Sequence, residues 1–269
     1  MNSRQLKDRV SPMKQLFFKL FITASLLWVF AGCKQGRQAG TVPQAVQIRI
    51  DSSLHPADSV DAFIQPYRSR LNAVLDTPLA FAPNHITKTE GRWNTPLGNL
   101  MADLMLDRAN AVARIRGEKR VEMALHNFGG MRSSISKGPV SERNAYEVMP
   151  FENKLVVVGM PGRAIKKMVG FLTTASRPHP VSGIEIVLEA DGNLKSIRIQ
   201  GQPINDERIY YVATSDYLMG GGDRMEFFND RVSISDTGYK IRNAMVDYFK
   251  ATDTLKAEID NRFIQLDTL

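Results

Sequence analysis

The spacing of apolar residues changes repeatedly along the chain after residue 45, and this change limits the available folds more than any other feature. Spacings of three and four residues, typical of helices, alternate with a spacing of two, typical of strands. The regular strand-helix-strand repeat of a doubly wound sheet is missing. The pattern therefore predicts one α+β domain, a mixed β-sheet with packed helices, over residues 45–269.

The individual elements follow from the same periodicity. Helices are predicted around residues 60–74, 97–104, 165–172 and 241–249, and strands around 47–50, 121–125, 155–160, 184–188, 197–199 and 210–213. Pro66 lies inside the first helix and is expected to kink it, whereas Pro96 suits a first helical turn. Asp191-Gly192, between two alternating segments, predicts a hairpin with a tight turn.

The first 33 residues have the layout of an export signal. They contain five basic residues and one acidic residue, and the 13 residues from Leu20 to Gly32 carry no charge. That stretch is too short to cross a bilayer, which takes about 20 residues. Phe30-Ala31-Gly32-Cys33 resembles the lipobox of a bacterial lipoprotein.

We therefore expect cleavage before Cys33 and attachment of lipid to Cys33. Residues 34–44 would then be a flexible tether, and the protein would be exported and anchored on the periplasmic side of a bacterial envelope membrane. An ordinary signal peptide, or an uncleaved anchor with an incidental cysteine, is the alternative.

Charge and motif content exclude several classes of function. Much of the net charge of +7 comes from the first 33 residues, and the rest shows no Lys/Arg cluster, so a nucleic-acid polymer is not an expected partner. The four histidines lack metal-binding spacings, and no Gly-x-Ser-x-Gly motif is present. We therefore predict no metal site and no catalytic residue in this chain.

Three loops carry the residues best suited to bind a ligand. His126–Arg132 and Ser215–Asp223 each follow a predicted strand and contain glycines that let backbone N–H groups approach a ligand closely. Val148–Asn153 lies between them. Each loop alone is also typical of a structural turn, and Phe151 after a proline is typical of a buried ring. Together, however, two aromatic residues, an arginine and an aspartate are the groups needed to hold a nucleotide.

Five segments occur in an order that resembles one known family. They are Pro96–Leu100, Asn127–Arg132, Pro150–Asn153, Val181–Gly183 and Gly221–Asp223. This set is similar to the C-terminal domain of the 5′-nucleotidases, the UDP-sugar hydrolase and ecto-5′-nucleotidase family, over roughly residues 45–265. In that family this domain binds the substrate, and a separate N-terminal metallophosphoesterase domain holds two metal ions and the catalytic histidine.

The resemblance implies a role for each residue of the predicted site. Phe151 and Tyr217 would hold the base between their rings, and Arg132 would contact the phosphate. The remaining implied contacts are Asn127 and Asn153 to the base or ribose, Asp223 to the ribose hydroxyls, and Arg92 to the phosphate. Arg92 stands one residue after the position where the family has a phosphate-binding arginine.

Several residues differ from the family pattern. Phe128 and Glu152 replace glycines, Arg224 replaces the glycine that often follows Gly-Gly-Asp, and Tyr217 replaces a phenylalanine. The ring of Phe128 is expected either to narrow the cleft or to become part of it.

No motif of the metallophosphoesterase domain is present before residue 45. We therefore expect the nucleotide-binding component of a split 5′-nucleotidase, a phosphomonoester hydrolase whose divalent metals belong to a separate metallophosphoesterase polypeptide. No cofactor is expected in this chain. One alternative is a lipoprotein that binds nucleotides or nucleosides for scavenging without hydrolysis, and another is a structural envelope domain.

Overall fold

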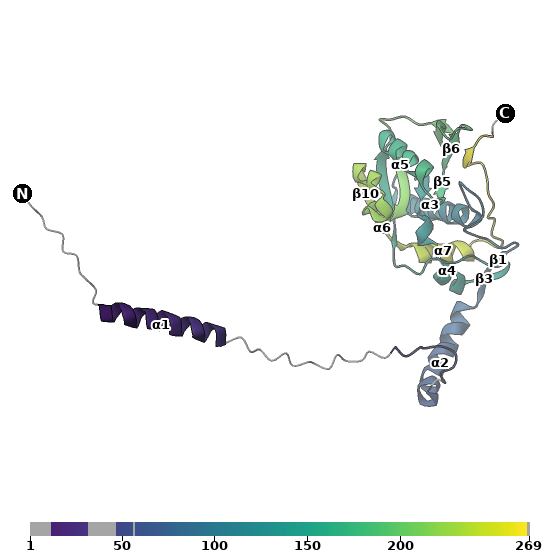
Figure 1. Cartoon of the computed structure of the whole chain (residues 1–269). Helices are drawn as coiled ribbons and strands as arrows, with labels where there is room; N and C mark the ends of the chain where they lie inside the picture. Colours follow the sequence, from purple (N-terminus) through teal and green to yellow (C-terminus); the bar gives the residue numbers. More distant parts are fainter. Residues whose placement is uncertain (1–11, 32–46, 56, 268–269) are drawn as a thin grey trace, which may run out of the picture. The chain divides into compact units, whose positions relative to one another are not determined.

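The computed structural model describes residues 12–31, 47–55 and 57–267. The chain divides into two units, residues 1–56 and 57–269 (Figure 1). The first contains helix α1 (Pro12–Ala31). Within the described residues, no helix combines the length and the apolar character needed to cross a membrane. Cys33 and the predicted tether, residues 34–44, lie outside the described residues.

The prediction of a strand at residues 47–50 is wrong. These four residues form no strand and are all exposed. Alternation alone does not stabilise a strand, because its backbone groups need a neighbouring strand to pair with.

A five-stranded mixed sheet forms the centre of the second unit, in the order β10-β4-β9-β2-β5. Its strands are β2 (Met123–Leu125), β4 (Lys154–Pro161), β5 (Val181–Ser182), β9 (Ile209–Ser215) and β10 (Ser233–Lys240). β2 and β9 run parallel, and every other neighbouring pair is antiparallel. The mixed α+β fold predicted from the sequence is therefore confirmed.

Alternate residues of the central strands face two separate cores. Leu155 and Val157 of β4 pack on one side with α3 (Pro96–Arg116), α4 (Glu142–Val148) and α7 (Ile241–Lys250). Val158 and Met160 of the same strand pack on the other side with α5 (Gly162–Thr174) and a second sheet. Because both faces are covered, β4 reads as a continuous apolar run.

The second sheet has the order β11-β6-β7-β8. Its strands are β6 (Ile184–Leu188), β7 (Leu194–Ile199), β8 (Gln202–Pro203) and β11 (Phe263–Gln265). The predicted hairpin is the β6–β7 pair, and Gly192 adopts a φ of +86° in its loop. A left-handed residue at this point closes a short hairpin loop. Strands β1 (Pro78–Ala82) and β3 (Gly138–Ser141) form a separate antiparallel pair.

The remaining elements connect these layers or extend from them. Helix α2 (Asp58–Leu75) is continuous through Pro66 and has no buried residue. Helix α6 (Asp216–Met219) and the 3₁₀ turns η1 (Phe128–Gly130), η2 (Gly222–Arg224) and η3 (Glu226–Asp230) follow strands of the central sheet or lie close to them in sequence.

The start and end of α3 follow the sequence signals. The Thr95 side chain accepts a hydrogen bond from the Gly98 N–H at 3.0 Å, Pro96 occupies the first turn, and Gly117 ends the helix at a φ of +65°. Side-chain capping satisfies an N–H group that has no partner inside the helix. Helix α3 packs on one face of the central sheet. The position of its C-terminal end therefore sets where the chain enters strand β2.

Replacement of Phe249 by alanine tests the helical core. Phe249 is fully buried in α7, and its removal leaves a cavity that the surrounding side chains fill only in part. We expect the free energy of unfolding to fall by about 3 to 5 kcal/mol in urea titrations. Ile115→Ala on the exposed face of α3 is the control and should change it by less than about 0.5 kcal/mol. Equal effects of the two substitutions would contradict the described core.

Candidate nucleotide-binding site

The sheet topology brings the three predicted loops to one edge. Because β2 and β9 are parallel, the loops that follow them both leave at the same end of the sheet. β4 is antiparallel to β9, so the segment that precedes it, Val148–Asn153, arrives at that end too. Loops separated by up to about 90 residues in the chain therefore meet because of strand direction alone.

A pocket of about 390 Å³ lies where these loops meet. It is lined by Asn127, Gly129, Gly130, Arg132, Phe151, Asn153, Tyr217 and Asp223. Six of the seven side chains predicted from the sequence to contact the ligand thus surround one cavity. Their individual binding roles remain predictions.

The two aromatic rings of the pocket stay accessible. Phe151 exposes 41 % of its surface and Tyr217 exposes 48 %. The guanidinium of Arg132 lies 5.9 Å from the centre of the Phe151 ring. An exposed ring face beside a cation offers a flat ligand both stacking and charge contacts.

Asp223 is held in place by two pocket residues. Its carboxylate accepts a hydrogen bond from the Tyr217 hydroxyl at 2.9 Å and another from Asn127 Nδ2 at 2.7 Å. The hydrogen bond to Asp223 raises the pKa of Tyr217. Asp223 itself has a φ of +52°, in the left-handed region that few side chains adopt. The hydrogen bonds therefore hold a strained residue in one orientation.

Gly222 is required by the same arrangement. A Cβ atom at this position would approach the Tyr217 ring to 2.5 Å. The glycine therefore lets the Tyr217 ring and the backbone before Asp223 come into contact.

A carboxylate neighbour also orients Asn153. Its Nδ2 donates to Asp216 Oδ1 at 3.1 Å, and the same oxygen accepts from the Tyr217 N–H at 2.8 Å. This leaves the side-chain oxygen Oδ1 of Asn153 as an acceptor for a ligand. The contact to the base or ribose implied for Asn153 stays a prediction with which this geometry is compatible.

The Glu152 side chain fixes the loop that carries Phe151. Its carboxylate pairs with Lys240 and with Arg242, and these two hydrogen bonds lower the pKa of Glu152 to about 2. Arg242 also donates to the carbonyl oxygens of Pro150 and Phe151 at 3.2 and 3.3 Å. The sequence motifs do not indicate Arg242, because it lies on α7, about 90 residues after Phe151 in the chain.

Arg92 does not join the pocket, contrary to its assignment with the site. Its guanidinium lies 4.8 Å from the centre of the Trp93 ring. It lines a separate pocket with residues 93–94, 259–261 and 263–265. Trp93 stacks on Phe263 of β11 at 4.8 Å, and this contact fixes residues 92–94 against the second sheet.

Two cationic side chains that the sequence analysis does not name, Lys88 and Arg177, lie beside the glycine-containing loop His126–Arg132. Lys88 Nζ is 4.7 Å and the Arg177 guanidinium 5.3 Å from the centre of the Phe128 ring. Lys88 also donates to the Met131 carbonyl oxygen at 2.6 Å. Burial lowers the pKa of Lys88, and the positive charges of Arg132 and Arg177 add to the decrease. Phe128 is therefore not a pocket wall but an aromatic contact for two cations near Arg132.

Buried His126 and partly buried His179 both contact the glycine-containing loop His126–Arg132. His126 is 1 % exposed, and neither of its ring nitrogens has a hydrogen-bond partner among the described residues. A Cβ atom at Gly130 would lie 2.4 Å from its Nε2, so the ring requires a glycine there. His179 Nδ1 accepts a hydrogen bond from the Phe128 N–H at 3.3 Å.

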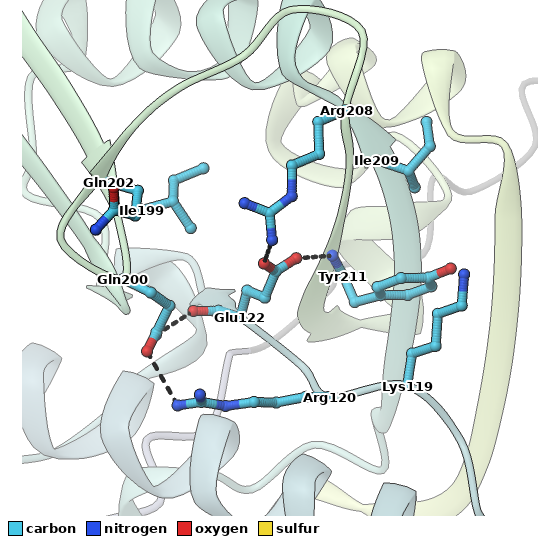
Figure 2. A pocket seen from close by; sticks show the side chains of 9 residues that line it. All are labelled: Lys119, Arg120, Glu122, Ile199, Gln200, Gln202, Arg208, Ile209 and Tyr211. Atoms are coloured by element: carbon cyan, nitrogen blue, oxygen red, sulfur yellow. Dashed lines mark hydrogen bonds and ion pairs between the residues drawn. The ribbon is translucent and has the colours of Figure 1, made fainter.

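A larger pocket of about 470 Å³ lies near the other end of β2 (Figure 2). Three of its four charged side chains have hydrogen-bond or ion-pair partners in the protein, and Lys119 Nζ lies 5.4 Å from the centre of the Tyr211 ring. Arg208 pairs with Glu122, Arg120 donates to Gln200 Oε1 at 3.0 Å, and Gln200 Nε2 donates to the Glu122 carbonyl oxygen at 2.6 Å. Gln200 and Gly201, both with positive φ, form the turn between β7 and β8. These contacts attach that hairpin to β2.

Within residues 12–31, 47–55 and 57–267, no group of three or more His, Cys, Asp or Glu side chains is placed to hold a metal ion. The side chains of the 390 Å³ pocket are suited to binding a polar aromatic ligand with a negative charge.

The sequence model of the family "5′-nucleotidase, C-terminal domain" matches residues 76–230. Because that match covers more than half of the chain, the protein belongs to this family.

Relatives and solved structures agree with that membership. The chain is 26 % identical over 172 residues to protein UshA of Escherichia coli, covering 61 % of this chain and 29 % of UshA. It is 31 % identical over 176 residues to the trifunctional nucleotide phosphoesterase protein YfkN of Bacillus subtilis, covering 60 % of this chain and 11 % of YfkN. The structure of a 5′-nucleotidase precursor from Thermus thermophilus superposes with a TM-score of 0.65 at 26 % identity, covering 80 % of this chain and 44 % of that one. The chain thus spans less than a third of these two curated relatives.

The buried histidine predicts a specific dependence of stability on pH. Burial lowers the pKa of His126 from 6.5 to about 4, the neighbouring His179 adds to the decrease, and Asp223 opposes it. The unfolded chain therefore binds the proton more tightly than the folded protein, so stability falls as the pH drops from about 6.5 to about 4.

We expect His126→Gln to reduce this loss by up to about 3 kcal/mol, measured by urea unfolding at each pH. His85→Gln, at an exposed position, is the control and should leave the slope unchanged. An identical pH dependence in His126→Gln and the wild type would contradict the assignment.

Proposed function

We propose that this protein is the substrate-binding component of a split 5′-nucleotidase. It would bind a nucleoside 5′-phosphate and present it to a metallophosphoesterase made as a separate polypeptide. The observation that carries the proposal is the convergence of six side chains, predicted from family motifs, on one pocket of about 390 Å³.

The chemistry of the pocket supports a nucleotide as its ligand. Phe151 and Tyr217 have accessible rings, and base stacking on such rings contributes about 1 to 3 kcal/mol for each base. Arg132 offers a forked donor for the phosphate. Lys88 and Arg177 add positive charge beside it, a role that would replace the one expected of Arg92.

Asp223 is suited to the ribose hydroxyls. Its two oxygens each accept one hydrogen bond in the structure, from Tyr217 and from Asn127. A carboxylate has about four acceptor positions, so it keeps capacity for two hydroxyl donors. Asn127 and Asn153 would contact the base or the ribose.

Hydrolysis requires groups that the described residues do not assemble. Divalent metal ions in the partner would activate water and neutralise the charge that develops on phosphorus. This chain would hold the nucleotide in orientation and exclude water from the base. Lipid on Cys33 would keep it at a bacterial envelope membrane, on the periplasmic side, where the partner would meet it.

Calorimetric titration with AMP and UMP tests the binding role. Residues 34–269 should bind at least one of them saturably, and the double variant Phe151→Ala, Tyr217→Ala should lose roughly tenfold or more in affinity because both stacking surfaces are removed. Phe63→Ala, Tyr67→Ala removes the same residue types from exposed positions on α2 and should leave affinity unchanged. Equal loss in both variants, or binding that survives in the pocket variant, would exclude this pocket.

An activity assay tests whether substrate binding and hydrolysis belong to separate polypeptides. Residues 34–269 with Mn²⁺ should not hydrolyse AMP, and activity should appear when a co-purifying metallophosphoesterase is added. Phosphate release at enzymatic rates from the chain alone would refute the split arrangement. Nucleotide binding with no phosphoesterase partner in pull-downs would favour the scavenging lipoprotein instead.

A further inference from the structure

Helix α2 carries an apolar stripe that no described residue covers. The stripe consists of Val60, Phe63, Ile64, Tyr67, Leu71 and Val74, all exposed. Phe63 and Tyr67 each expose 69 % of their surface, and their ring centres lie 5.9 Å apart. Six large apolar side chains along one exposed helix face mark an interaction surface.

The spacing of the stripe selects a helical partner. Val60, Ile64, Tyr67, Leu71 and Val74 are separated by steps of four, three, four and three residues. This is the a/d pattern of a coiled coil, with Ile64 and Leu71 at a and the other three at d. Pro66 falls at position c, away from the seam.

Among the described residues, the side-chain hydrogen bonds between α2 and the remainder of the domain lie at the C-terminal end of the helix. Arg143 donates to the Asn72 carbonyl oxygen Oδ1 at 2.8 Å and to Asp76 Oδ2 at 3.0 Å. A helix of this length is marginally stable in water when it is not packed. A partner along the seam would therefore stabilise it.

The charges of α2 argue against a lipid surface as that partner. Asp58 and Asp61 balance Arg68 and Arg70, so the helix carries no net charge. Helices that lie in a membrane interface are typically rich in Lys and Arg on the polar face.

The flanking residues are complementary to a second copy in antiparallel orientation. With Ile64 packed against Tyr67 of the other helix, Val60 meets Leu71 of that helix. Asp61 and Arg68 pair with each other within one helix at 3.0 Å. The e positions also place Asp61 beside Arg68 of the second copy, which joins the two pairs into a four-charge network, and the g positions place Phe63 beside Arg70 of the second copy. Two-fold symmetry forms each contact twice.

We propose that α2 is a self-association surface through which two copies of this chain pair as an antiparallel coiled coil. A parallel pair leaves Asp61 facing residue 56, a proline, and brings Tyr67 against its own copy. The antiparallel register is therefore the one that the charges favour. This inference does not depend on nucleotide binding.

Sedimentation of the full chain in a mild detergent tests the proposal. We expect a reversible monomer–dimer equilibrium whose dissociation constant rises at least tenfold in Ile64→Asp. Ser69→Asp places the same charge at position f, on the opposite side of α2, and should leave the dissociation constant within twofold of the wild type. Circular dichroism and the nucleotide titration show that each variant folds.

A charge exchange tests the orientation. Asp61→Arg should weaken the dimer roughly fivefold, because two ion pairs become like-charge contacts. The double variant Asp61→Arg, Arg68→Asp should have the dissociation constant of the wild-type dimer. Asp61 and Arg68 also pair within one helix at 3.0 Å, so mixing the two single variants separates the two contributions. Preferential pairing of Asp61→Arg with Arg68→Asp, each of which holds like charges within its own helix, is expected only if residues 61 and 68 face each other across the interface.

Three results would overturn the proposal. They are a monomer at all concentrations, a dimer that Ile64→Asp does not weaken, and a failure of the charge exchange to restore pairing. Loss of phosphoesterase capture in Ile64→Asp, with a chain that is otherwise monomeric, would assign the stripe to that partner instead.

Discussion

The pairing of β2 with β9 in parallel, next to an antiparallel β4, is the constraint on which the candidate site depends. It brings the ends of three distant segments to one edge of the central sheet. The strands themselves are covered on both faces by apolar packing, so the edge is rigidly held. The loops are then free to carry polar and aromatic groups, because the sheet already provides the burial that stabilises the domain.

Within the loops, close contacts explain why glycine occupies two particular positions. Gly130 is needed by the His126 ring and Gly222 by the Tyr217 ring, so both glycines permit tight packing around the pocket. Asp223 stands in a strained backbone conformation and is oriented by Tyr217 and Asn127. A preoriented acceptor loses less freedom when a ligand binds, which favours recognition of a particular hydroxyl arrangement.

The long elements could be predicted from the sequence, as could six of the side chains that line the candidate pocket, and the remaining differences have identifiable causes. Helices α3, α5 and α7 and strands β4, β6 and β9 have enough residues to show their periodicity. Strands such as β5 and β8 have two residues each and show none. Ordered motifs located six pocket residues. Arg92 was misplaced because the stacking of Trp93 on Phe263, which joins distant segments, directs it elsewhere. Lys88, Arg177 and Arg242 were missed because only the tertiary fold brings them to the loops.

In the proposed complex, a nucleotide lies with its base between Phe151 and Tyr217 and its phosphate at Arg132. A crystal structure of residues 34–269 grown with AMP or UMP tests it most directly. We expect electron density for the base between those two rings, ribose hydroxyls at Asp223, and the phosphate on the side of Arg132 that faces Lys88 and Arg177. A nucleotide bound elsewhere, with this pocket empty, would contradict it.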